Sequence, residues 1–217
     1  MPEIDNIGNA IVKGVLNPEA KDLAVDLGDL ELDSLIDESV LKDVPFIKTI
    51  IACRKTWGAI RDQLFLRKIA KFLHSCPSFS EQEREQFIQK HLTDPKEAKK
   101  LSDALVLILD RLDDLEKPEM IAKICAAYVR DEISFDLFRR LNAAVDIGFI
   151  EDLKEFAAWE PVKDQYGRTD AHTRALYGSL LRTGLTSIPR GTGTAPILAV
   201  SINVNELGKT FKKCMAA

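Results

Sequence analysis

A long amphipathic segment at residues 45–73 constrains the fold of this chain more than any other feature. Its apolar residues recur at steps of three and four, which is the period of a helix with one buried side. Pro45 suits a first helical turn, and Asp43 just before it can cap that turn. Because charged residues interrupt the segment throughout, it is not a membrane span, which needs roughly 20 apolar residues in succession.

The other side of this helix is basic. Residues 46–75 contain seven Lys or Arg and one acid. We interpret the segment as the central helix of a soluble bundle, with its charges solvated or paired with acidic neighbours. A second interpretation stays open, in which the basic face and the aromatic residues opposite make peripheral contact with an anionic membrane. The residues expected to contact a partner are Lys48, Lys55, Arg61 and Lys68.

Charge is segregated along the whole chain. Residues 1–45 have a net charge of −8, residues 46–75 of +6, residues 76–160 of −7 and residues 161–217 of +5. Such alternation predicts charge pairing between blocks and leaves the basic C-terminal block as a surface for an acidic partner. The acidic residues 1–44 either pack beside the basic helix or form an arm that orders on binding or self-association, so a homo-oligomer stays open.

Helix start signals follow one another after the basic helix. Ser80 and Glu83 have the spacing of a capping box, and the pair Asp94-Pro95 starts the next helix in the same manner. Further helices are expected after Pro118 and after Ser134. Short connections between several helices predict an antiparallel bundle, which we assign to residues 45–148.

The pattern changes in residues 149–217. Two helices come first, and Asp170 and Gly184 are suited to cap the beginning and end of the second one. Two β-branched runs at 185–189 and 197–203 follow, joined by a glycine-rich stretch, and Asn205 can cap a last helix. Two helices, a hairpin and a further helix are typical of a winged-helix-like unit. The predicted fold is therefore mainly α, a helical bundle followed by a winged-helix-like module with a small β-hairpin.

If this module binds nucleic acid, residues 171–190 would form the contact. The expected contact residues are His172, Thr173, Arg174, Arg182 and Arg190. Between Arg174 and Arg182 only Tyr177 and Ser179 could read bases, so the helix is poor in base-reading residues.

No residue pattern indicates catalysis, a metal or a cofactor. The chain contains four cysteines without C-x-x-C spacing and three scattered histidines. Asp110, Asp113 and Asp114 lie near a helix end without a base or nucleophile at a defined spacing. We therefore expect a non-enzymatic cytoplasmic protein with reduced thiols, no metal and no cofactor.

Four stretches resemble a group of bacterial helical proteins, uncharacterised in function, that are found with prophages or in anti-phage defence neighbourhoods. They are residues 32–45, 60–73, 107–120 and 200–211. The resemblance implies a role in phage–host conflict and carries no catalytic residues. The first hypothesis is thus a sensor, adaptor or inhibitor that binds another macromolecule, with a protein as the foremost partner. The alternatives are a winged-helix DNA-binding regulator and a membrane-associated effector that uses residues 46–73.

Overall fold

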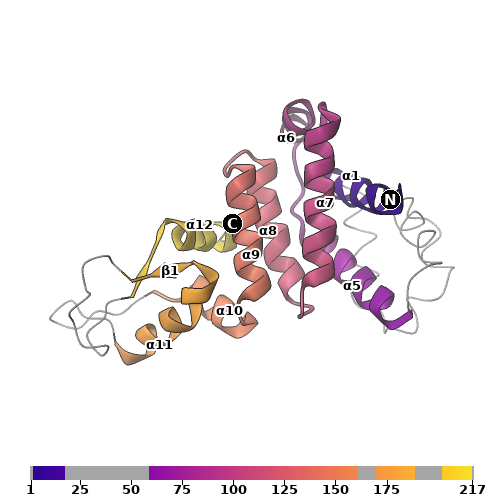
Figure 1. Ribbon diagram of the computed structural model, residues 1–217. Helices are drawn as coiled ribbons and strands as arrows, with labels where there is room; N and C mark the ends of the chain where they lie inside the picture. The colour runs from indigo at the N-terminus through magenta and orange to yellow at the C-terminus, as the bar shows by residue number, and fades with distance from the viewer. Residues whose placement is uncertain (1, 18–58, 161–169, 189–201, 217) are drawn as a thin grey trace. The chain divides into compact units, whose positions relative to one another are not determined.

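The computed structural model describes residues 2–17, 59–160, 170–188 and 202–216 (Figure 1). Within these ranges the chain is mainly helical with one small antiparallel sheet, as the sequence predicts. It divides into two compact units, Met1–Ser134 and Phe135–Ala217. The helical pattern predicts residues 135–147 as part of the bundle domain, whereas their contacts group them with the second unit.

The first unit is a bundle of helices. It contains α1 (Pro2–Leu16), α5 (Ala59–Ser75), α6 (Glu81–Phe87), the π-helical turn η3 (Ile88–Leu92), α7 (Pro95–Arg111) and α8 (Lys117–Val129). Helix α1 packs against α7 and α5, and α5 packs against α8. The fully buried apolar side chains include Ile11, Phe72, Leu105, Leu109, Ile121 and Ile124. Apolar positions spaced by three and four residues thus form one core, as the periodicity predicts.

Helix α1 is held close to α7 at a glycine. A Cβ atom placed at Gly8 would lie 2.7 Å from the Cβ of Ser102, so only glycine allows this approach. Ser102 Oγ also donates a hydrogen bond to Asn9 Oδ1 at 3.1 Å. The beginning of the acidic opening is therefore a packed helix of the first unit, and the predicted arm over residues 18–44 lies outside the described residues.

Helix α5 is the C-terminal part of the predicted central helix. Ile69, Phe72 and Leu73 are buried at the expected spacing, and Phe65 is buried as well, whereas Leu64, which the spacing places on the apolar side, is exposed. The preceding residues 45–58 lie outside the described ranges. No helix within the described residues is long and apolar enough to cross a membrane.

The predicted caps of α6 and α7 are confirmed. Glu83 N donates to Ser80 Oγ at 3.2 Å, and Ser80 N donates to the Glu83 carboxylate at 2.7 Å, which completes the capping box. Asp94 caps α7 by accepting from Lys96 N at 2.8 Å. The helix that starts at Glu81 does not stay regular, because its last turn widens to a π-helix at Ile88.

The described residues of the second unit form four α-helices and the small sheet. These are α9 (Phe135–Ile147), α10 (Ile150–Ala158), α11 (Ala171–Ser179), the 3₁₀ turn η4 (Leu180–Thr183), β1 (Thr186–Ser187), β2 (Asn203–Val204) and α12 (Glu206–Ala216). The two strands are antiparallel, and Thr186 pairs with Val204 while Ser187 pairs with Asn203. The predicted hairpin thus has its base within the described residues, and its tip at 189–201 lies outside them.

Helix α12 contacts the beginning of the hairpin through a second close approach. A Cβ atom at Gly208 would lie 2.1 Å from the Leu185 carbonyl oxygen, so a larger residue would push the helix away. Asn205 caps α12 by accepting from Gly208 N at 3.1 Å, and its side-chain amide donates to the Gly184 carbonyl at 2.8 Å. Gly184 has the left-handed φ of 76° that the predicted helix end requires.

Candidate functional site

Helix α11 is fixed at its start by one buried threonine. Asp170, the N-cap, accepts from Thr173 N at 2.8 Å and from Thr173 Oγ1 at 2.9 Å. Thr173 Oγ1 in turn accepts from Trp159 Nε1 at 3.0 Å, and Thr173 is fully buried. The hydrogen bond from Thr173 N, followed by that from its hydroxyl, lowers the pKa of Asp170. These three side chains set the position and the rotation of the helix.

The two sides of α11 and η4 differ in chemistry. The buried side consists of Thr173, Leu176, Tyr177, Leu180 and Thr183. The exposed residues are Ala171, His172, Arg174, Ala175, Ser179 and Arg182. From Ala171 to Thr183 the sequence contains no Asp or Glu, and neither arginine forms an ion pair with another described residue. The exposed face of α11, defined by these six residues, therefore carries positive charge.

His172 is held at one edge of this face. Its Nε2 and the Glu155 carboxylate of α10 share a short hydrogen bond, and its ring lies edge-on to Trp159 with centroids 4.9 Å apart. Glu155 thus offsets any positive charge on His172. Arg174 and Arg182 remain as the cations of the face.

The predicted nucleic-acid residues therefore have different positions. Arg174 and Arg182 are exposed, as a contact with phosphate requires. Thr173 is buried and is an anchor of the helix, so it does not belong to the exposed face of α11. Its partner Trp159 was not predicted, and the sequence gives no signal for that pairing. Arg190 lies outside the described residues.

Of the predicted partner-binding residues in the basic helix, only one has a described side chain. Lys68 Nζ donates to the Asp110 carbonyl oxygen at 3.1 Å and so links α5 to the end of α7. Arg61 lies in α5, and nothing is described of its side chain. Lys48 and Lys55 lie outside the described residues. Both the protein-partner role and the membrane role of this helix stay predictions.

The acidic residues near the end of α7 bind neighbours in the same unit. Asp113 pairs with Lys117 Nζ at 2.6 Å, and the Lys117 side chain is almost completely buried while Asp113 is exposed. This hydrogen bond lowers the pKa of Asp113. Asp114 accepts from Glu116 N at 2.6 Å. The spacing of four residues between Asp113 and Lys117 was the available signal for the pair, but their burial could not be predicted from it.

The π-helical turn η3 places His91 among aromatic rings. Its ring centroid lies 5.1 Å from that of Phe87 and 4.9 Å from that of Tyr128, and Nδ1 shares a hydrogen bond of 3.0 Å with the Tyr128 hydroxyl. Burial lowers the pKa of His91, and burial raises the pKa of Tyr128 to about 12. His91 Nε2 is enclosed and has no hydrogen-bond partner within the described part of the chain.

A pocket of about 390 Å³ lies beside this turn. It is lined by Gln86, Phe87, Gln89, Lys90, His91 and Asp131. Lys90 Nζ and Asp131 pair across it at 2.6 Å, and Asp131 has a positive φ of 59°. Because Lys90 and Asp131 neutralise each other, the lining of the pocket does not indicate whether a ligand would be positively or negatively charged.

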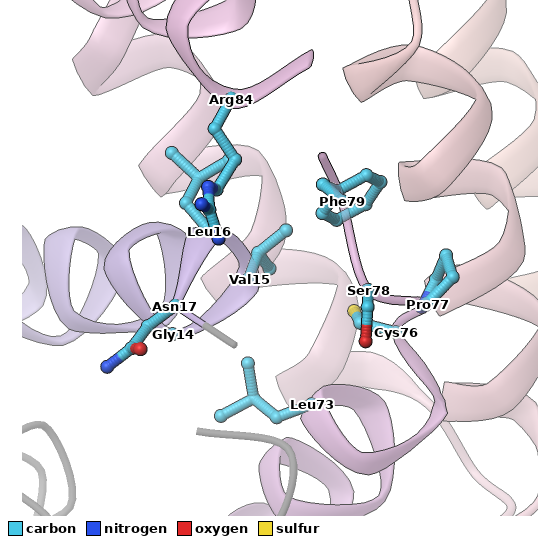
Figure 2. A pocket seen from close by; sticks show the side chains of 10 residues that line it. All are labelled: Gly14, Val15, Leu16, Asn17, Leu73, Cys76, Pro77, Ser78, Phe79 and Arg84. Carbon is cyan, nitrogen blue, oxygen red and sulfur yellow. The ribbon is translucent and has the colours of Figure 1, made fainter. Parts of the chain in front are cut away.

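A second cavity lies where the end of α1 meets the segment after α5. Figure 2 shows Leu73, Cys76 and Phe79 around it, with Val15 and Leu16 of α1 opposite. Its volume is about 10 Å³, enough for one water molecule at most. It is therefore a packing gap. Among the described residues, no three His, Cys, Asp or Glu side chains gather in a way that could hold a metal ion.

Comparisons of this chain with protein-family models, with curated proteins and with solved structures gave no match. The site is therefore interpreted from its own geometry. The exposed face of α11 combines positive charge that is unpaired among the described residues with a firmly anchored backbone.

The anchor predicts a clear effect of Thr173→Val. This variant keeps the shape of the side chain and removes the hydroxyl that joins Asp170 to Trp159. Because the Trp159 N–H then loses its partner, we expect the free energy of unfolding to fall by about 1–3 kcal/mol. Chemical denaturation measures this change. Thr210→Val is the matched control, since the Thr210 hydroxyl donates to the Glu206 carbonyl within α12 and Thr210 is only partly buried. An equal loss of stability in both variants would contradict the role of Thr173 as an anchor.

The His91 cluster predicts a pH dependence of stability. The pKa of His91 in the folded protein is lower than the usual 6.5, so protonation favours the unfolded chain. The His91 contribution is complete above pH 6.5 and decreases as the pH falls from 6.5 toward the lower folded-state pKa. Denaturation from about pH 7.5 to about pH 5 measures it.

We expect His91→Gln, which cannot titrate, to reduce this pH dependence. The matched control is a Gln substitution of the exposed His74 in the same unit. A pH dependence that persists unchanged in His91→Gln would show that other groups cause it.

Proposed function

We propose that this chain is a non-enzymatic, cytoplasmic protein of phage–host conflict that acts by binding another macromolecule. We propose further that its second unit is a winged-helix-like module whose partner is double-stranded DNA. The observation that carries the proposal is the exposed face of α11, where Arg174 and Arg182 form no ion pair with another described residue, on a helix anchored by Thr173.

The order of elements supports a winged-helix-like module. Helices α9, α10 and α11 precede an antiparallel strand pair, and α12 follows it. In modules of this class the helix before the hairpin enters the DNA groove. Here that helix is α11, and it is also the helix with the cationic exposed face.

Electrostatics supports DNA as the partner. Phosphate groups supply most of the affinity of DNA for proteins, and arginine binds them with two parallel hydrogen bonds. Helix α12 adds the exposed Lys213 on the same unit, whereas Lys209 pairs with Glu206 at 2.6 Å. The role in phage–host conflict rests on the resemblance carried by residues 32–45, 60–73, 107–120 and 200–211.

The proposal predicts that Arg174→Ala combined with Arg182→Ala weakens DNA binding. Fluorescence anisotropy with a labelled duplex of about 20 base pairs measures the dissociation constant at several salt concentrations. We expect affinity to fall at least about tenfold, and the slope of log K against log[salt] to shrink by about 1.8, because two phosphate contacts are lost. Circular dichroism checks that the variant is folded.

The matched control is Arg139→Ala combined with Arg140→Ala. Both of these arginines are exposed on α9 of the same unit, so the net charge changes equally. If α11 forms the contact, this control retains most of the affinity. Equal weakening by both double variants, or binding that does not respond to salt, would contradict the proposal.

A further inference from the structure

The two arginines of α11 lie on opposite edges of its exposed face. Successive residues turn by about 100° in an α-helix and by about 120° in a 3₁₀ turn. Arg174 lies in α11 and Arg182 lies in η4, so their directions around the axis differ by roughly 140°. The buried side, with Leu176, Tyr177 and Leu180, occupies the opposite part of the circumference.

The same two arginines are also separated along the axis. Five α-helical steps and three 3₁₀ steps place their Cα atoms about 13 Å apart along the helix. The major groove of B-form DNA is about 12 Å wide. A helix lying in this groove has one strand on each side, so side chains that point about 140° apart direct Arg174 to the phosphates of one strand and Arg182 to those of the other, at positions about 13 Å apart along the groove.

Between these arginines lie the small residues Ala171, Ala175 and Gly178, together with the half-buried Leu181. Ala171, Ala175 and Gly178 have no hydrogen-bonding side chain that could reach a base edge. The Ser179 hydroxyl already donates to the Leu176 carbonyl at 2.9 Å. Base edges are read chiefly through hydrogen bonds with Arg, Lys, Asn, Gln, Glu or Asp side chains, which the middle of this face lacks, so it offers bases only alanine methyl contacts to thymine.

We infer that α11 enters the major groove of B-form DNA, binds phosphates on both strands through Arg174 and Arg182, and reads almost no base sequence. This inference rests on the proposed function and specifies its partner as duplex DNA of any sequence. The small residues allow the helix backbone to come close to the base pairs, while the arginines fix its orientation across the groove.

Other nucleic acids fit this geometry less well. The major groove of A-form RNA is deep and narrow, so a helix with side chains does not enter it. A single strand offers one line of phosphates and therefore meets only one of the two arginines at a time. We expect duplex DNA to bind more tightly than duplex RNA or single-stranded DNA of the same sequence.

The test compares full-length protein binding to several probes of equal length. These are duplex DNAs of mixed, A·T-rich and G·C-rich sequence, a duplex RNA and a single-stranded DNA. Dissociation constants should differ by less than about tenfold among the DNA duplexes, since a base-reading site loses about that much at a single wrong base pair. The RNA duplex and the single strand should bind at least about tenfold more weakly.

Ala175→Phe tests groove entry without changing the charge. A large side chain in the middle of the face would hold the helix away from the base pairs, so we expect affinity for duplex DNA to fall by about tenfold or more. The matched control is Ala143→Phe, at an exposed position of α9. It should leave the affinity unchanged.

The possible results distinguish a failure of this inference from a failure of the proposed function. Binding to none of the probes would overturn both. Strong preference for one DNA sequence, equal affinity for RNA and DNA duplexes, or full affinity of Ala175→Phe would overturn the inference alone, because DNA binding itself would persist.

Discussion

The burial of one hydroxyl group determines what the second unit can present to a partner. Thr173 Oγ1 donates to Asp170 and accepts from Trp159, so the first turn of α11 cannot rotate without breaking these two part-buried hydrogen bonds. Because rotation is fixed, Leu176 and Tyr177 point into the core and Arg174 points outward. The charge of the exposed face is thus a consequence of how its first turn is anchored.

The far end of the same helix is held by the hairpin and α12. Gly208 lets α12 touch the Leu185 carbonyl, and the Asn205 amide donates to the Gly184 carbonyl just after η4. Thr186 Oγ1 donates to the Tyr177 carbonyl at 2.7 Å, which ties β1 to α11. With both ends fixed, the separation of Arg174 and Arg182 is set by the backbone, and only their side chains need to adjust to a partner.

Features that depend on residues close together in the sequence were predictable. The caps at Ser80, Asp94 and Asp170 involve residues two or three positions apart, and the apolar spacing of α5 and α7 reveals their buried sides. Burial of Thr173 and Lys117 was not predictable, because it depends on packing that brings Trp159 or Asp113 to them. From the sequence alone, a polar residue in the first turn of a helix, such as Thr173, can be either exposed or buried in the core.

The most direct test of this account is an NMR titration of the protein with a DNA duplex. It follows the side-chain Nε–H signals of Arg174 and Arg182 together with the backbone amides of Ala175 and Gly178. The account predicts that all four signals shift together and reach saturation as duplex is added, because Arg174, Ala175 and Arg182 belong to the exposed face of α11 and Gly178 lies beside them. Saturable shifts confined to α9 or to the first unit, with these four signals unchanged, would contradict it.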